Sequence, residues 1–445
     1  MNRRQFISRT AIAAAAPLVI TNFNVFGADA PSNKLTLALI GSWGRGEAHF
    51  ESLATQNVVA LCDVNSDHLA FGLQKFPGAK TYADWRKLLD DHQTLGLDGV
   101  VICSPDHTHA FITNWALNRG LHVYCEKPLA NTIEEARIVR ANYLSKKSKL
   151  ATQVGTQRHA FQNFNRVKEL IRDGAIGELQ AAYAWGNRQL RKPGYLPAAG
   201  EAPSTLNYDL WLGPSPFHPY NPGYFSGASG ANCLEWNMYW DFGNGQVGDM
   251  GSHTMDLAWN AIDATTTTAA EAKGDPFNPE VSPVELETHT EHPANEWRGP
   301  IKLSWYQGGA LPKSPRDYIN LNKIGHGAMF KGTKGFLIAG FENRILIPFS
   351  DDADLTYFKP RAKSEVLPPL GNFQKEWFDA CKGNLKTSCN FDYAGQMIEQ
   401  MLLGLVAYRA GQRIEWDAAA GRVTNLPEAN QYLSKKYREG WTMNG

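Results

Sequence analysis

The sequence predicts an α/β fold, in which a doubly wound parallel sheet is followed by an α+β domain with an open, mainly antiparallel sheet. The first observation is a series of short apolar runs separated by amphipathic stretches over residues 34–154. Such runs are typical of parallel strands that helices cover on both faces. The second observation is a change after Gly155, where alternating strands and long Gly, Pro and aromatic connections prevail. We therefore expect two domains, at residues 34–154 and 155–445.

The composition is that of a soluble globular protein with no charge excess. The chain has 445 residues, with 44 Lys and Arg against 44 Asp and Glu. This balance argues against binding to nucleic acid or to an anionic membrane. The chain also holds 13 Trp and 16 Tyr, which suits a carbohydrate site and large cores equally well.

Residues 1–30 are interpreted as a targeting segment that takes no part in the fold. Arg3 and Arg4 precede Phe6, as in a twin-arginine export signal. The apolar run "AIAAAAPLVI" is shorter than the roughly 20 residues that span a bilayer. Ala28 to Ala30 offer a cleavage site, and no cysteine follows the run to carry a lipid anchor. We expect export in the folded state by the twin-arginine machinery, a periplasmic or extracellular location and no stable membrane anchor.

Five apolar runs are the expected strands of the first domain: "LTLALI", "VVALC", "GVVIC", "LHVYC" and "LATQV". The stretches "TYADWRKLLDD" and "NTIEEARIVRANYL" between them are expected helices. In the second helix, Thr132 and Glu135 have the spacing of a capping box. A fold of this kind binds its ligands beyond the carboxyl ends of the strands.

The second domain is expected to open with a helix, "NFNRVKELIRDG", that ends at Gly174. Its expected strands are "LQAAYAWGN", "IKLSWYQGG" and "GFLIAGFENRILIPF". The late segment "AGQMIEQMLLGLVAYRAG" is apolar at helical spacing. We expect this last helix to pack between the domains or onto the sheet.

The stretch "LTLALIGSWGRGEAHF" has the features of a dinucleotide-binding loop, with one exception. Gly41 and Gly46 allow a tight turn and a close helix, whose N-terminus faces phosphate. The middle glycine of the usual motif is replaced by Trp43. Asp63, 22 positions after Gly41, ends the second strand, where an acidic residue accepts hydrogen bonds from a ribose 2′-hydroxyl. A carboxylate repels a 2′-phosphate, so NAD is favoured over NADP.

Two later strand ends, "CSPDHTHA" and "YCEKPLA", complete the expected cleft. Pro128 disfavours helical geometry at Lys127 and so helps to hold this lysine at its strand end. There the lysine can donate to a substrate hydroxyl or a developing alkoxide, although a solvated surface lysine is the alternative. The candidate cofactor-binding residues are Gly41, Trp43, Gly44, Arg45, Gly46, Asp63, Ser104, Pro105, His109, Glu126 and Lys127.

Asp249 and His253 form the candidate acid–base pair, because four residues separate them and place them on one helical face. A carboxylate beside an imidazole suits general acid or base catalysis. On spacing alone, the alternative of a capping aspartate and a structural histidine is favoured.

No spacing of cysteine or histidine predicts a metal site. His107 and His109 lie two apart at a helix start, where their side chains diverge. Cys62, Cys103 and Cys125 end expected core strands and should be buried thiols. The sequence leaves open whether Cys381 and Cys389 pair after export.

Taken together, "GSWGRG", Asp63, "CSPDHTHA", "CEKPLA", "RVKELIRDGAIGEL", "DLWLGPSPFHPY" and "GDMGSHTMD" resemble the Gfo/Idh/MocA family, from about Lys34 to the end of the chain. The resemblance implies a Rossmann domain, a C-terminal α/β domain for substrate and oligomerisation, and assembly as a homo-oligomer.

The resemblance also implies a reaction, in which hydride moves reversibly between nicotinamide C4 and a carbinol carbon of a sugar or polyol. It assigns catalysis to Lys127, which polarises the oxygen, His253, which takes the proton, and Asp249, which orients the histidine. Trp43 departs from the family pattern, and Gly44 is expected to re-route the loop so that the indole faces outward.

Export adds a condition, because no nicotinamide pool exists outside the cytoplasm. We therefore expect a tightly held cofactor that the substrate chemistry regenerates. Two schemes meet this condition: an oxidoreductase with two half-reactions, and a redox-neutral NAD-dependent glycosidase of the α-N-acetylgalactosaminidase kind. A third interpretation is a non-catalytic sugar-binding relative in which Trp43 blocks the cofactor.

Overall fold

The structure is a computed structural model that describes residues 33–186, 188, 199–225, 233–350, 357 and 361–444. The targeting segment expected at residues 1–30 lies outside these ranges. Within them, no helix is both long and apolar enough to cross a membrane.

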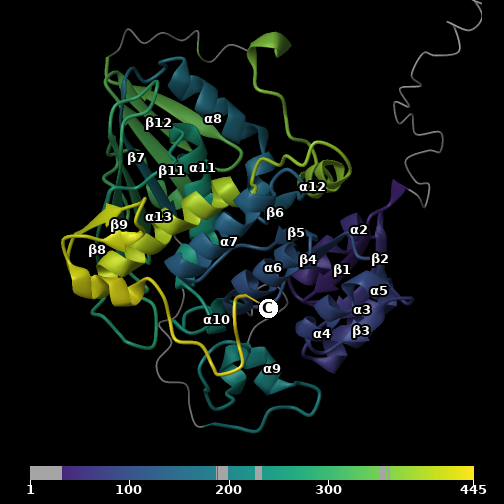
Figure 1. The fold of residues 1–445 in the computed structure, drawn as a ribbon. Coiled ribbons are helices and arrows are strands. Elements are labelled where there is room, and N and C mark those ends of the chain that lie inside the picture. Colours follow the sequence, from purple (N-terminus) through teal and green to yellow (C-terminus); the bar gives the residue numbers. More distant parts are fainter. Residues whose placement is uncertain are drawn as a thin grey trace, which may run out of the picture. The chain divides into compact units, whose positions relative to one another are not determined.

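The first sheet is parallel, has six strands and runs in the order β3-β2-β1-β4-β5-β6 (Figure 1). Its order reverses between β1 and β4, which creates the crevice where a doubly wound sheet binds its ligand. The strands are β1 (Thr36–Ile40), β2 (Asn57–Cys62), β3 (Lys80–Tyr82), β4 (Gly99–Ile102), β5 (His122–Cys125) and β6 (Thr152–Val154).

The helices of this domain follow the predicted pattern with one difference. Residues 81–91 were expected to be one helix, but Tyr82 pairs with Cys62 as the end of a short strand. The helix begins only at Trp85, where the side chain of Asp84 caps it. The predicted capping box of Thr132 and Glu135 is confirmed. The helices are α2 (Phe50–Leu53), α3 (Ser66–Lys75), α4 (Trp85–Asp90), α5 (His92–Leu95), α6 (Asp106–Asn118) and α7 (Ile133–Lys146).

The second sheet has nine strands in the order β13-β12-β11-β7-β10-β9-β8-β14-β15. Among its described pairs only β7 and β10 are parallel, so the predicted α/β fold class with a mainly antiparallel second sheet is confirmed. The strands are β7 (Leu179–Gly186), β8 (Ala269–Gly274), β9 (Leu286–His292), β10 (Ile301–Gln307), β11 (His326–Gly332), β12 (Gly335–Ala339), β13 (Arg344–Pro348), β14 (Ile414–Asp417) and β15 (Arg422–Val423).

The long helix α13 (Phe391–Ala410) joins the two domains, as predicted. It packs against α7 of the first domain and against β8 and β9 of the second sheet (Figure 1). The fit is close, because a Cβ at Gly404 would lie 2.8 Å from Cβ of Thr288. The other helices of this domain are α8 (Gln162–Arg172), α9 (Tyr208–Leu212), α10 (Cys233–Trp236), α11 (Ser252–Ile262) and α12 (Phe373–Lys382).

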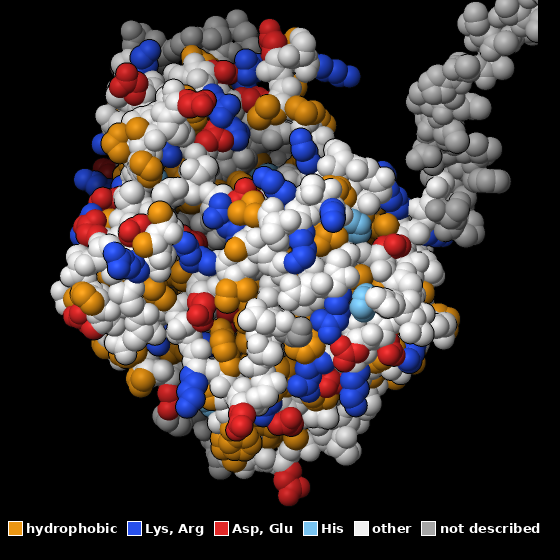
Figure 2. All heavy atoms as spheres, viewed as in Figure 1, with side chains coloured by type: hydrophobic (Ala, Val, Ile, Leu, Met, Phe, Trp, Pro, Cys, Tyr) orange, Lys and Arg blue, Asp and Glu red, His pale blue; other side chains and the backbone are white. Residues whose placement is uncertain are grey.

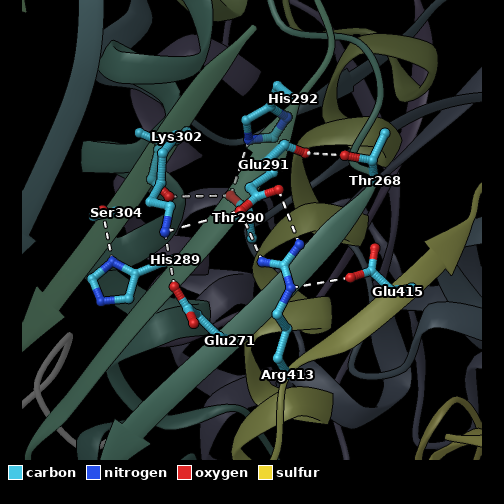
Figure 3. Close-up of polar contacts among 11 residues, drawn as sticks. Thr268, Glu271, His289, Thr290, Glu291, His292, Lys302, Ser304, Arg413 and Glu415 are labelled. Carbon is cyan, nitrogen blue, oxygen red and sulfur yellow. Dashed lines mark hydrogen bonds and ion pairs between the residues drawn. The ribbon is translucent and has the colours of Figure 1, made fainter. Parts of the chain in front are cut away.

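The two faces of the second sheet differ in polarity. Along β9, Thr288 and Thr290 are buried on the side of α13, whereas His289 and Glu291 alternate with them on the opposite face. On that opposite face Arg413 makes a bidentate ion pair with Glu291, at 2.8 and 3.0 Å (Figure 3). Figure 2 shows charges of both signs interspersed over the viewed surface, in keeping with the equal totals.

Candidate active site

Lys127 and Asp249 meet where the two domains face each other. Lys127 follows β5 and is joined to Pro128 by a cis peptide bond. Its Nζ donates to Oδ1 of Asp249 at 2.5 Å. Asp249 lies in η5 (Val247–Gly251), a π-helical turn that leads directly into α11. Two candidate residues 122 positions apart are thus brought into direct contact.

The second oxygen of Asp249 is bound by a residue that the sequence did not single out. Arg188 donates from Nη1 to Oδ2 of Asp249 at 2.6 Å. Burial alone would raise the pKa of Asp249, but the charges of Lys127 and Arg188 outweigh it and lower the pKa to about 2. The carboxylate is therefore ionised at any working pH and holds both cations in place.

The contact expected between Asp249 and His253 is not found among the described hydrogen bonds. A buried carboxylate gains more from two cationic donors than from a neutral imidazole, which explains the pairing with Lys127 and Arg188. His253 lies in the first turn of α11 and is buried, and its Nδ1 has no hydrogen-bond partner among the described residues. Asp249 therefore positions the lysine directly, whereas it acts on the histidine only through its charge.

His253 is uncharged at neutral pH. Burial is the main cause, and the positive charges of Lys127 and Arg158 add to it, so that the pKa falls to about 3. A neutral imidazole with an unpartnered nitrogen can accept a proton. The arrangement therefore provides a proton acceptor beside an ammonium group that a carboxylate holds.

Asp106 is a further group of this site that sequence reasoning missed, although it lies in the motif "CSPDHTHA". It is the first residue of α6 and is buried. Burial raises its pKa to about 8, against the opposing charge of Lys127. At neutral pH Asp106 is therefore mostly protonated and adds little negative charge.

The glycine loop after β1 is built as the motif predicts. A Cβ at Gly41, where φ is +88°, would lie 2.6 Å from the backbone of Cys103. At Gly46 a Cβ would lie 2.0 Å from the carbonyl oxygen of Gly41. The expected helix begins as a 3-10 turn, Gly46–His49, and continues into the short α2. Only glycine fits at the two motif positions.

Trp43 does not fill the loop. Gly44 has a φ of +63°, which redirects the chain immediately after the tryptophan. The half-buried indole stacks on the ring of His68, with 4.6 Å between the ring centroids. The predicted re-routing at Gly44 is thus present, and the indole lies over α3.

Asp63 is fixed at the end of β2, beside the loop. Its Oδ2 accepts from the backbone N–H of Ser42 at 2.9 Å, and its Oδ1 accepts from that of Asn65 at 3.0 Å. Nδ1 of His68 lies 3.2 Å from Oδ1. Asp63, His68 and Trp43 therefore form a connected group along one edge of the nucleotide crevice.

Glu126 lies behind the loop as a buried anchor. Its Oε1 pairs with Nε of Arg45 at 2.9 Å and with Nε2 of His49 at 2.8 Å. Burial alone would raise its pKa, but the charges of Arg45 and His49 hold it well below the usual range. Oε2 is buried and has no hydrogen-bond partner among the described residues. Glu126 thus orients Arg45 and His49 through one oxygen, while the other oxygen lies against Gly155.

The remaining cofactor candidates connect two strand-end loops. The ring nitrogens of His109 lie 2.7 Å from the carbonyl oxygens of Pro128 and of Ser104, which precedes Pro105. Both ring nitrogens of this buried histidine contact backbone carbonyl oxygens, so His109 connects the loop after β4 to the loop after β5. His107 is also buried, with Nε2 2.8 Å from the carbonyl oxygen of Trp211.

The described residues contain one group that resembles a metal site. It consists of His159, Asp256 and Cys389, which are all buried, with candidate ligand atoms within 4.8 Å of one another. Asp256 is already bound by His159 Nδ1 at 2.9 Å and by the hydroxyl of Tyr393 at 2.6 Å. This network joins the 3-10 turn η3 (Gln157–Ala160) to α11 and α13.

The five cysteines whose side chains the structure describes are free thiols. Cys62, Cys103 and Cys125 are buried, as predicted. Cys381 and Cys389, whose pairing the sequence left open, are both unpaired.

Two family models match the chain. Residues 35–156 match an oxidoreductase family model with an NAD-binding Rossmann fold, named GFO_IDH_MocA. Residues 175–277 match the model of the C-terminal alpha/beta domain of the same family. The glycine loop, Asp63, Glu126 and Lys127 lie in the first match, and Asp249 and His253 lie in the second.

Curated relatives match about a third of the chain. Inositol 2-dehydrogenase of Salmonella typhimurium is 31% identical over 150 residues, or 32% of this chain and 43% of that protein. Rhizopine catabolism protein MocA of Rhizobium meliloti is 29% identical over 148 residues, or 33% of this chain and 45% of that protein. The chain thus spans less than half the length of these relatives.

Solved structures share the fold over a longer range. Levoglucosan dehydrogenase in complex with NADH and levoglucosan has a TM-score of 0.58 at 17% identity, covering 86% of this chain and 99% of that one. The WlbA dehydrogenase from Bordetella pertussis in complex with NADH and UDP-GlcNAcA has a TM-score of 0.59 at 15% identity, with coverage of 86% and 99%. At 15% and 17% identity, these matches show only that the chain shares the fold of the two dehydrogenases.

Proposed function

The chain belongs to the Gfo/Idh/MocA oxidoreductase family, and its first domain is the family's NAD-binding Rossmann domain. On this premise we propose that the protein transfers hydride between a tightly held NAD and a hydroxyl-bearing carbon of a sugar or polyol. The contact of Lys127 with Asp249, next to the neutral imidazole of His253, is the observation that carries the proposal. The names of the relatives, which include inositol dehydrogenases, support a polyol or sugar as substrate.

The residues present fit a dinucleotide. Gly41 and Gly46 bring the backbone of the loop close to the crevice, and Asp63 offers its carboxylate to a ribose hydroxyl. Glu126 has a buried oxygen, Oε2, without a hydrogen-bond partner among the described residues. Bound NAD would supply the hydride acceptor.

In the proposed reaction the protein accepts the proton of the substrate hydroxyl and stabilises the negative charge that develops on the hydroxyl oxygen. His253 accepts the proton of the substrate hydroxyl, since its imidazole is neutral above a pH of about 3. Lys127 donates a hydrogen bond to the same oxygen as negative charge develops there. Asp249 stays ionised and holds the ammonium group in place. The reverse reaction uses the same groups in the opposite order.

The test uses the purified full-length protein and two readouts. First, the protein is denatured, and NAD in the supernatant is measured; we expect close to one nucleotide per chain. Second, the native protein is mixed with a panel of sugars and polyols, and the absorbance of reduced nicotinamide is followed. Absence of nucleotide together with no reduction would contradict the proposal. Hydrolysis of a glycoside without net reduction would favour the redox-neutral glycosidase instead.

We further propose that the protein is exported in its folded state. The proposal rests on Arg3 and Arg4 before the apolar run, in a segment outside the described residues. Replacing both arginines with lysine should keep the protein in the cytoplasm, which cell fractionation measures. Export that persists in this variant would contradict a twin-arginine route. Homo-oligomer formation is likewise a proposal, and light scattering of the purified protein tests it.

A further inference from the structure

The part of the site around Lys127, Asp249 and His253, here called the reacting end, carries more positive than negative charge. Lys127 and Arg188 share the carboxylate of Asp249. Arg158 is a third cation, and its side chain has no ion pair or hydrogen bond among the residues that the structure describes; its Nη1 is buried. The carboxylates of Asp249 and, more weakly, Glu342 act on it from beyond ion-pair distance, but Lys127 and Arg188 already pair with Asp249. Asp106 does not balance the excess, because burial raises its pKa to about 8.

Arg158 is held in place by its neighbours. Gln157, on one side, donates from Nε2 to Oε1 of Glu126 at 2.7 Å. His159, on the other side, pairs with Asp256 at 2.9 Å. The guanidinium group lies 4.1 Å from the centre of the Phe341 ring. Arg158 is therefore a fixed cation with no ion pair among the described residues, an arrangement that an anionic ligand would stabilise.

A second set of unpartnered polar atoms lies next to this cation. Phe341 also faces the ring of His326, at 6.4 Å between centroids, and His326 pairs with Gly186 across β11 and β7. A Cβ at Gly186 would lie 3.3 Å from Nδ1 of His326 and 3.4 Å from Oε1 of Gln246. Both atoms are buried and have no hydrogen-bond partner in the described part of the chain.

These unpartnered atoms are connected to Asp249 through Arg188. Gln246 donates from Nε2 to the carbonyl oxygen of Arg188, and Arg188 lies two residues after Gly186. One region beside Lys127 and Asp249 is thus lined by four polar side chains: Arg158, Arg188, Gln246 and His326. Trp305 also lies there, with Cη2 3.0 Å from a Cβ at Gly186, so a larger residue than glycine would crowd this edge of the region. The unpartnered polar atoms of His326 and Gln246 suit the hydroxyls of a ligand.

Building on the oxidoreductase function proposed above, we propose that the substrate is a carboxylated sugar or polyol, such as a uronate. Arg158 and Arg188 bind its carboxylate, and His326 and Gln246 bind its hydroxyls. The reacting hydroxyl lies at Lys127 and His253. A guanidinium group suits this task because its planar fork matches a carboxylate. The excess of charge is local, since the chain as a whole has equal numbers of acidic and basic residues.

The test is calorimetric titration of the full-length protein with its bound cofactor. Glucose, galactose and mannose are each compared with their uronates, and glucose 6-phosphate is included. We expect at least one uronate to bind roughly tenfold or more tightly than its parent sugar. Arg158→Gln should weaken that uronate roughly 10- to 100-fold and leave the neutral sugars within about twofold.

Two further variants sharpen the test. Arg119→Gln is the matched control. Arg119 follows the C-terminal end of α6, roughly 20 Å from Asp106 at the start of the same helix. This variant should change neither the affinity for uronates nor that for neutral sugars. Arg188→Gln, at a side chain that is 37% exposed, repeats the affinity measurement if truncation at Arg158 prevents folding. Uronates that bind no better than neutral sugars, or equal losses for both classes in Arg158→Gln, would overturn the proposal. Preferential binding of the sugar phosphate would overturn it as well.

Turnover separates this inference from the function on which it rests. If uronates bind through Arg158 but no compound reduces the bound cofactor, the anion site stands and the oxidoreductase function fails. If neutral sugars reduce the cofactor as readily as their acids do, the function stands and the carboxylate site fails.

Discussion

Two buried carboxylates, Glu126 and Asp249, mark the two ends of the site, and they serve different purposes. Glu126 pairs with Arg45 and His49, both from the glycine loop and the turn after it. Asp249 pairs with Lys127 and Arg188, which come from the two different domains. The ion pairs of the nucleotide end thus form within the first domain, and Gln157 of the second domain adds one hydrogen bond to Glu126. The ion pairs of the reacting end, in contrast, need both domains. This difference predicts that the two ends can be damaged separately.

The largest effect is expected at the reacting end. Lys127→Met and His253→Ala should each lower kcat by roughly 10²-fold or more, because each removes a group that moves or steadies charge in the reaction. Bound NAD should stay close to wild-type occupancy, since the ion pairs of Glu126 with Arg45 and His49 do not involve Lys127 or His253. Steady-state kinetics and nucleotide release on denaturation measure the two quantities. Loss of NAD from both variants would show that the two ends are not separate.

The next effect concerns the nucleotide end. A 2′-phosphate would meet the carboxylate of Asp63, and a like-charge contact of this kind costs several kcal/mol in a partly desolvated site. NAD should therefore bind roughly 10²-fold more tightly than NADP after nucleotide exchange. Asp63→Ser should narrow this ratio without changing the sugar preference. Tighter binding of NADP to the wild-type protein would contradict this role of Asp63.

A smaller effect appears in acid. The pKa of Asp249 falls from its ordinary 3.8 to about 2, so its ion pairs stabilise the folded state above a pH of about 4. Their contribution to the free energy of unfolding, about 2 kcal/mol, is lost as the pH falls through about 2. In urea unfolding at several pH values, Asp249→Asn should lack this part of the acid dependence. Asp379→Asn, which breaks an exposed pair with Lys375, is the control and should keep it.

How far the site could be predicted depends on the range of the interactions. The capping box, the glycine loop and the strand ends that carry Asp63 and Lys127 follow from residues close together in sequence, and they were predicted. The partners of Asp249 were not, because Arg188 lies 61 positions away and no spacing links the two. Residues 81 and 82 were assigned to a helix because local periodicity does not show that Tyr82 pairs with Cys62. Strands β8, β9, β11, β14 and β15 were missed. Burial alternates along β9, but its inward positions include Thr288, Thr290 and His292, which a hydrophobic pattern does not reveal.

The smallest effect belongs to Trp43. Its indole stacks on His68, which also contacts Asp63. If this stack shields the nucleotide, it slows release by an amount set by aromatic packing, ~1 kcal/mol. Trp43→Gly should then lose NAD roughly fivefold faster on dialysis while the initial turnover of the loaded protein stays nearly unchanged. An unchanged rate of loss would show that the tryptophan does not retain the cofactor.

The most direct test of the proposed reaction follows the hydride itself. A uronate or polyol that reduces the bound cofactor is prepared with deuterium at the reacting carbon. After one turnover, the nucleotide is released and analysed by mass spectrometry. We predict that the reduced nicotinamide carries the deuterium in the wild-type protein and that this label is nearly absent in Lys127→Met over the same time. Reduced nucleotide without deuterium, or equal labelling in the variant, would contradict hydride transfer at Lys127, Asp249 and His253.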